Sequence, residues 1–171
     1  MNDEPSQSQT DECSGLLTCL EVEQRALEQL LFKLREQNLI LTAGDQRWLA
    51  ASTSEVAAAV VELTEAGRRR ETAAQIAHGA HGLPSGSTLA DLADSVDDEL
   101  TGQLMRQRQV ALRDVLDQVR RCSRHNRRLL ASGLAATNDA LALLGATTSY
   151  DSSGEMLQEG LSDIRAYDLK A

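Results

Sequence analysis

The chain has 171 residues, which fits one domain with a single modest core. Aromatic residues make up only 2% of it, so the core has to be built from Leu, Val and Ala, which suits long, closely packed helices. The formal net charge of -9 argues against nucleic acid or an anionic membrane surface as a partner, because both attract a local excess of Lys and Arg.

The first predicted helix covers residues 13–43. The preceding residues 1–12 are polar and acidic with little to bury, so we predict a disordered acidic tail there. Leucines in the helix follow a/d heptad spacing, at Leu16, Leu20, Leu27, Leu30, Leu34 and Leu41. Gly44 suits the left-handed conformation that often ends a helix, and Asp45 is suited to cap the next one.

A second helix is predicted over residues 46–77, where Leu49, Val56 and Leu63 recur at seven-residue spacing. The short turn before it predicts an antiparallel hairpin. Residues 78–87 contain three glycines and Pro84, which indicates a loop. A short amphipathic helix over residues 88–97 follows, starting at Ser87 or Thr88.

The last long helix is predicted over residues 101–144. Its a/d positions are Leu112, Val115, Val119, Cys122, Leu129, Ala136 and Leu143. Asn126 falls on the same stripe, where a buried amide costs stability but can fix the register of helix pairing. We assign this structural role to Asn126 with the adjacent Leu129 and Leu130. The predicted fold is all-α, an elongated antiparallel bundle of coiled-coil-like helices over residues 13–145.

Residues 146–171 are predicted to form a flexible tail with a conditional helix. Ser152 and Glu155 have capping-box spacing. Four apolar residues after them would share one helical face: Met156, Leu157, Leu161 and Ile164. So short a helix gains most from packing against something else, which is either a partner helix or the chain's own bundle.

No catalytic, cofactor or metal site is expected. The glycine-rich loop lacks the lysine of a phosphate-binding loop, and His78 and His81 have no further ligand beside them. His125 on a long helix is compatible with phosphotransfer, although the Lys-Gly that usually follows such a His is replaced by arginines. The three cysteines, Cys13, Cys19 and Cys122, lack metal-ligand spacing and are expected to be free thiols.

A cluster of arginines, Arg120, Arg121, Arg124, Arg127 and Arg128, has three readings. It is a solvated or ion-paired helix face, a protein-binding patch, or a nucleic-acid contact, and the lack of interleaved aromatic residues disfavours the last. The amino terminus has no basic segment followed by an apolar run, and polar residues interrupt the apolar stretches. We therefore expect a cytoplasmic protein without membrane insertion.

Two short motifs carry a resemblance to a known family. Asn126-Arg127-Arg128-Leu129-Leu130 is followed by Gly133-Leu134, and Tyr150 comes after the helix with Gly154 four residues later. With the Leu-rich first helix and the order of long helices, this pattern resembles the FlgN family over about residues 13–154.

The resemblance implies a chaperone that holds unassembled hook-associated proteins, prevents their aggregation and delivers them to the flagellar type III export gate. Members of the family bind their client with the carboxyl-terminal part, which here implies the tail face of Met156, Leu157, Leu161 and Ile164. The Tyr after the long helix, here Tyr150, is linked to docking at the export gate membrane protein. The alternative is a structural adaptor or coiled-coil oligomer without a secretion client, which sedimentation would reveal as a constitutive oligomer.

Overall fold

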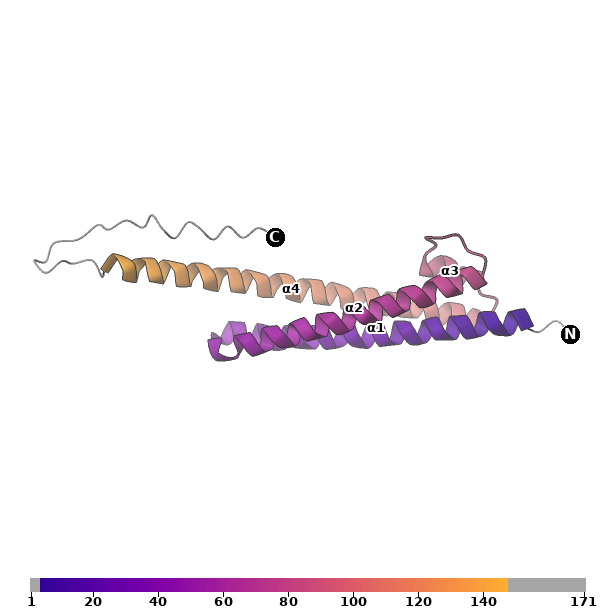
Figure 1. The fold of residues 1–171 in the computed structure, drawn as a ribbon, viewed down its shortest axis with the longest axis horizontal. Coiled ribbons are helices and arrows are strands. Elements are labelled where there is room, and N and C mark those ends of the chain that lie inside the picture. The colour runs from indigo at the N-terminus through magenta and orange to yellow at the C-terminus, as the bar shows by residue number, and fades with distance from the viewer. Residues whose placement is uncertain (1–3, 148–171) are drawn as a thin grey trace, which may run out of the picture. The chain divides into compact units, whose positions relative to one another are not determined.

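The computed structural model describes the backbone of residues 4–147 and the side chains of residues 9–144. Its elements are α1 (Glu4–Ala43), the short 3-10 helix η1 (Gln46–Trp48), α2 (Leu49–Ala80), α3 (Leu89–Ser95) and α4 (Glu99–Thr147) (Figure 1). No strand occurs among these residues, so the predicted all-α helical bundle is confirmed. The chain forms two compact units, Met1–Leu129 and Leu130–Ala171, and α4 contributes to both.

Helix α1 begins at Glu4, which corrects the prediction of a disordered tail for residues 4–12, whereas residues 1–3 lie outside the described part. Pro5 does not prevent this start, because proline is tolerated in the first turn of a helix, where its missing N–H has no partner anyway. Gln9 also anchors this end of α1, since its side-chain amide donates to the carbonyl of Ala80 at 2.8 Å. Residues 4–12 are therefore helical although they are mostly polar, and Gln9 fixes this part of α1 to the end of α2.

The other boundaries differ by a few residues. Helix α2 continues to Ala80, so His78 is helical and the predicted loop over residues 78–87 begins only at His81. Helix α4 starts at Glu99 and ends at Thr147, beyond the predicted 101–144 at both ends. Asp45 does not cap the following helix and binds Arg47 instead.

Local chemistry explains where the helices end. Gly44 has a φ of 68°, as predicted for a residue in the left-handed region after α1. Thr88 caps α3, since its hydroxyl accepts from the N–H of Asp91 while the Asp91 carboxylate accepts from the N–H of Thr88. Asp98 plays a similar part for α4 by accepting from the N–H groups of Leu100 and Thr101.

Helices α1 and α2 form the predicted antiparallel hairpin. Contacts between their side chains run in opposite directions along the two helices: Glu23 pairs with Arg70, Lys33 with Glu55, and Gln37 with Thr53. The seam of α2 is narrow, with Ala59, Ala66 and Ala77 buried, so the two helices approach closely.

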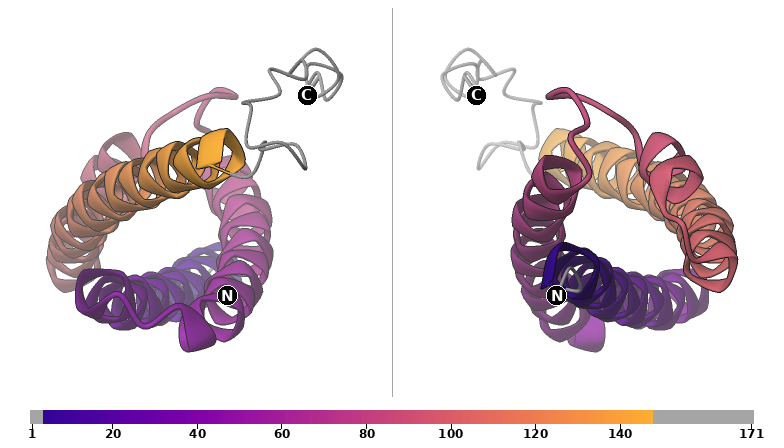
Figure 2. Two further views of the ribbon diagram at one scale, coloured as in Figure 1. Left: turned by 90° about the vertical axis from the view of Figure 1, so that its left-hand side faces the viewer. Right: turned by 90° about the vertical axis from the view of Figure 1, so that its right-hand side faces the viewer.

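The first part of α4 packs on this hairpin and runs parallel to α1. Arg108 donates to Gln24, Arg35 to Gln118, and Asn38 to Asn126, so partners advance together along both helices. The end-on views show α1, α2 and the first part of α4 as distinct helices (Figure 2).

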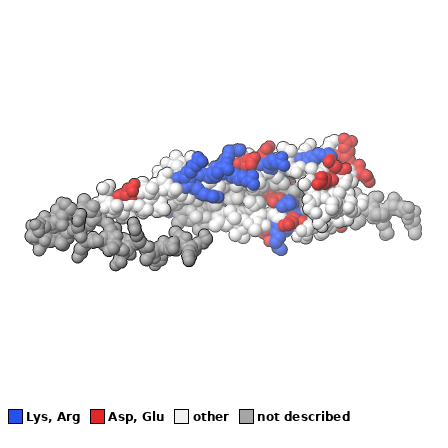
Figure 3. Space-filling view, turned by 90° about the horizontal axis from the view of Figure 1, so that it is seen from above, with Lys and Arg blue, Asp and Glu red and all other residues white. Residues whose placement is uncertain are grey.

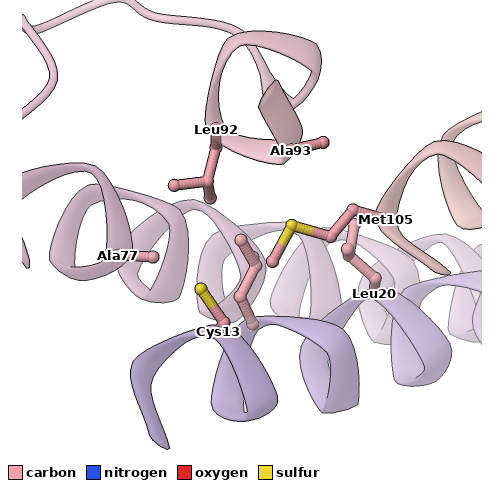
Figure 4. Packing of buried hydrophobic residues seen from close by; sticks show 7 residues of the cluster. Cys13, Leu20, Ala77, Leu92, Ala93 and Met105 are labelled. Carbon is pink, nitrogen blue, oxygen red and sulfur yellow. The ribbon is translucent and has the colours of Figure 1, made fainter. Parts of the chain in front are cut away.

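Two buried apolar clusters hold this unit together. The first joins α1, α2, α3 and α4 through Cys13, Leu16, Leu20, Ala77, Leu92, Ala93 and Met105 (Figure 4). The second joins the three long helices through Leu27, Leu30, Leu31, Leu34, Ala59 and Val119. Five of the six predicted heptad leucines of α1 belong to these clusters: Leu16, Leu20, Leu27, Leu30 and Leu34. None of the described helices is long and apolar enough to cross a membrane.

Candidate partner-binding site

The five predicted partner-binding residues, Tyr150, Met156, Leu157, Leu161 and Ile164, lie outside the described residues. The described part of the chain contains the other three predicted site residues, Asn126, Leu129 and Leu130. The candidate site is therefore built from α4, the helix that leads into the predicted tail.

Asn126 is the most deeply buried polar residue of α4, with 2% of its surface exposed. Its amide nitrogen donates to the carbonyl oxygen of Leu34 at 2.8 Å and to Oε1 of Gln37 at 3.1 Å. Its amide oxygen accepts from Nδ2 of Asn38 at 2.8 Å. An amide buried in a leucine-rich seam would cost stability if unpaired, and here both ends of the amide have partners.

The sequence reasoning missed the partners of Asn126, which all lie on α1. Gln37 is buried and also donates to the hydroxyl of Thr53 at 3.2 Å, which extends the polar contacts to α2. We call Asn126, Gln37, Asn38 and Thr53 the polar junction. A signal for it existed, because the leucine spacing of α1 skips from Leu34 to Leu41 and leaves polar residues at the intervening core position.

Beyond the polar junction, α4 changes from a packed helix to an exposed one. Leu129 is half-buried, and every described side chain from Leu130 to Leu144 is exposed. Among them, Leu130, Leu134 and Leu141 are four and seven residues apart and share one side of the helix, which we call the leucine stripe. Their exposed fractions are 38%, 64% and 61%. A row of large apolar side chains exposed to water is a typical binding surface for another apolar helix face.

The histidines and cysteines do not form an enzyme-like arrangement in the described part of the chain. His81 Nε2 lies 3.3 Å from Cys13 Sγ, beside a cavity of about 140 Å³. Cys13 is 1% exposed, and burial, with a smaller effect of Glu12, raises the pKa of its thiol above the ordinary value. A raised pKa disfavours the thiolate, which is the nucleophilic form.

His78 and His125 belong to no three-residue group of possible metal ligands among the described residues. His78 Nε2 lies 3.4 Å from the carbonyl oxygen of Thr88, and His125 is exposed on α4. No group of three His, Cys, Asp or Glu side chains with metal-binding geometry occurs among the described residues, and Cys13, Cys19 and Cys122 are unpaired.

A family model described as FlgN protein matches residues 13–158, which is most of the chain. The matched range contains the polar junction, the leucine stripe and Tyr150, and it ends shortly after Met156 and Leu157. No curated protein and no solved structure matches the chain.

Proposed function

Because the chain belongs to the FlgN family, which supports a general role as a flagellar export chaperone, we propose that it binds unassembled hook-associated proteins. In this proposal it covers their terminal amphipathic helices, prevents premature aggregation and delivers them to the membrane protein of the export gate. The family is a chaperone family, and we propose no enzymatic step. The role would place the protein in the cytoplasm.

The leucine stripe is the observation that carries the client-binding part of this proposal. Subunits that polymerise through amphipathic helices expose apolar faces before assembly, and such faces aggregate unless another apolar surface covers them. Leu130, Leu134 and Leu141 offer a surface of this kind. We propose that the client helix packs along this stripe and along the predicted tail face of Met156, Leu157, Leu161 and Ile164.

Tyr150 stands between these two apolar surfaces in the sequence. We propose that it contacts the export gate, as the family resemblance implies. A docking residue between two client-binding surfaces would connect client loading and delivery, because both partners would meet on neighbouring residues.

The leucine stripe is tested by Leu134→Ser with Leu141→Ser in the full chain. Both side chains are exposed, so circular dichroism should show an unchanged fold. Binding to a purified hook-associated protein should weaken at least about tenfold, because removing two buried leucines from an interface costs on the order of 1.4 kcal/mol or more. Calorimetry or quantitative co-purification measures the effect.

Leu100→Ser is the matched control, since Leu100 lies on the same helix with 70% exposure but outside the stripe. The control should bind like the native chain. Equal binding by the stripe variant and the control would exclude the stripe from the client interface.

The predicted tail is tested by a chain that ends after Gly145. The bundle should stay folded, because its buried clusters lie entirely before this residue. Client binding should be lost while the circular dichroism spectrum still shows a helical protein. Undiminished client binding by the shortened chain would remove the tail from the proposal.

A further inference from the structure

A groove of about 310 Å³ lies among the helices of the unit Met1–Leu129. Two buried leucines of α1 line it, together with half-buried leucines of the other three α-helices. They are Leu20 and Leu27 of α1, Leu63 of α2, Leu89 of α3, and Leu112 and Leu116 of α4. We call this feature the bundle groove. Because four of its six leucines are only half-buried, part of its apolar wall is open to solvent.

The size of the bundle groove suits the side chains of a helix. A closed apolar cavity of about 150 Å³ holds one benzene molecule, so a groove about twice as large has room for two leucine-sized side chains. Side chains three or four residues apart lie about 5–6 Å from each other on one face of a helix. Two such neighbours can therefore enter the groove together, as in complexes where an amphipathic helix binds an apolar groove.

The charged residues that line the bundle groove favour an acidic partner. Glu23 and Arg70 neutralise each other in an ion pair at 2.8 Å. Arg113 also lines the groove, is exposed, and makes no hydrogen bond or ion pair with any described residue. The α4 side of the groove therefore offers a guanidinium group that a carboxylate of a partner can bind.

Two further arginines continue this positive charge along α4. Arg120 and Arg127 follow Arg113 at seven-residue intervals, which places the three on one side of the helix, about 10.5 Å apart. Both are exposed and have only long polar contacts: Arg120 approaches Asp117 at 3.5 Å, and Arg127 donates to the hydroxyl of Ser123 at 3.3 Å. Basic side chains gather along the middle of the surface in Figure 3. We call Arg113, Arg120 and Arg127 the arginine row.

We propose that the bundle groove binds an amphipathic helix of another protein, with two apolar side chains between the leucines and carboxylates along the arginine row. Glutamates seven residues apart on the partner helix have the same spacing as the three arginines, because both helices rise about 1.5 Å per residue. Burial of the apolar side chains supplies most of the affinity, and the arginine row selects a partner with an acidic flank.

Other occupants match these residues less well. A nucleic acid can bring phosphates to the arginine row, but its charged backbone gains nothing from a groove of leucines, and none of the described residues that line the groove is aromatic. A second copy of the chain offers the leucine stripe, but residues 130–144 contain a single carboxylate, at Asp139. The proposal does not rest on the client interface proposed above, because every residue it uses lies in the unit Met1–Leu129.

The groove is tested with a synthetic helical peptide that carries leucines on one face and three glutamates at seven-residue spacing on its flank. The full chain is labelled with ¹³C in its leucine methyl groups. On titration with the peptide, the methyl signals of Leu63, Leu112 and Leu116 should shift, whereas those of the exposed Leu100 and Leu134 should stay in place. A control peptide with serines instead of leucines should cause no shift.

The arginine row is tested by fluorescence anisotropy of the labelled peptide at about 0.15 M salt. Arg113→Glu with Arg120→Glu should weaken binding at least about tenfold, because two attractions become repulsions. A peptide with lysines instead of glutamates should bind this variant more tightly than the native chain. The matched control is Arg25→Glu with Arg68→Glu, which reverses two exposed arginines of the hairpin outside the groove. It should change the affinity by less than about twofold, because salt screens distant charges.

Three results would overturn the proposal. The first is that millimolar peptide leaves the groove methyl signals unchanged or shifts only those of the leucine stripe. The second is that the hairpin reversal weakens binding as much as the reversal in the arginine row. The third is that a short oligonucleotide binds more tightly than the peptide, which would assign the arginine row to nucleic acid.

Discussion

Asn126 connects α4 to two turns of α1 through three hydrogen bonds, and no apolar residue at its position could do the same. Its amide faces the carbonyl of Leu34 and the side chains of Gln37 and Asn38, so only one alignment of the two helices satisfies all four groups. The adjacent leucines pack without such direction, because apolar contacts are tolerant of small shifts along a helix. We propose that the polar junction fixes the register of α4.

Asn126→Ala should lower the free energy of unfolding by about 2 kcal/mol, because it leaves the amide oxygen of the buried Gln37 without this donor and the side-chain amide of Asn38 without its acceptor. Denaturant unfolding followed by circular dichroism measures the change. Asn138→Ala is the control, since Asn138 is exposed on the same helix, and its effect should stay within about 0.5 kcal/mol. Equal effects at the two positions would contradict the buried role.

The register role itself needs a different change, in which Asn126, Gln37 and Asn38 all become Leu. With Leu at all three positions no buried amide is left unpaired. The free energy of unfolding should therefore recover most of what Asn126→Ala loses. Helices α1 and α4 should then pair in more than one register, and sedimentation should show a mixture of oligomeric states. A uniquely monomeric triple variant would show that packing alone sets the register.

Two glycines of α4 give a second comparison at single positions. A Cβ added at Gly102 would lie 2.7 Å from the carbonyl oxygen of Ala93, whereas nothing lies within 4 Å of one at Gly133. Gly102→Ala should therefore destabilise the chain by about 1–3 kcal/mol, because α3 has to move away. Gly133→Ala should be neutral or stabilise by up to about 1 kcal/mol through better helix propensity. Thermal unfolding of the two variants distinguishes these outcomes. Similar changes in melting temperature for both variants would rule out close packing of α3 on Gly102.

At the scale of elements, the capping box of α3 should make that helix sensitive to acid. Hydrogen bonds from the backbone N–H and then the hydroxyl of Thr88 hold the pKa of Asp91 below its ordinary value. A lowered pKa in the folded state means that the cap stabilises the fold above the unfolded pKa of about 3.9. The stabilisation is lost as the pH falls through the lower folded value.

The expected result is that Asp91→Asn is less stable than the native chain at neutral pH and that the difference disappears in strong acid. Unfolding curves of both chains at several pH values measure it. Asp139→Asn is the control on an exposed helix position, with no difference at any pH. A difference for Asp91→Asn that persisted unchanged at low pH would show that the carboxylate is not the capping group.

Most elements could be predicted from the sequence because their signals are local. Heptad leucines predicted α1, Gly44 predicted its end, and Ser87 or Thr88 was predicted to start the short helix that is α3. The start of α1 at Glu4 could not be read from composition, since its anchor is Gln9 binding the distant carbonyl of Ala80. The polar junction was only half predicted for the same reason: Asn126 is visible as a polar residue in a stripe, while Gln37, Asn38 and Thr53 are recognisable only once the helices are paired.

At the scale of the whole molecule, Asn126 and the leucine stripe belong to one continuous helix. The stripe was not predicted as a site, because a leucine at helical spacing is usually a core residue. Its exposure is known only from the structure, in which every described side chain from Leu130 to Leu144 is exposed. Family membership, by contrast, followed from the order of motifs along the chain and is confirmed by the match over residues 13–158.

The lack of buried side chains from Leu130 to Leu144 has a consequence for backbone amide exchange. A helical segment without tertiary packing is marginally stable in water, so its hydrogen bonds open with little free energy, whereas those in a packed core open only with global unfolding. Deuterium uptake should therefore rise steeply within the uninterrupted α4, just after Leu129. Deuterium uptake before Leu129 would report the stability of the bundle. When a partner is added, slower uptake after Leu129 would identify the residues that the partner orders.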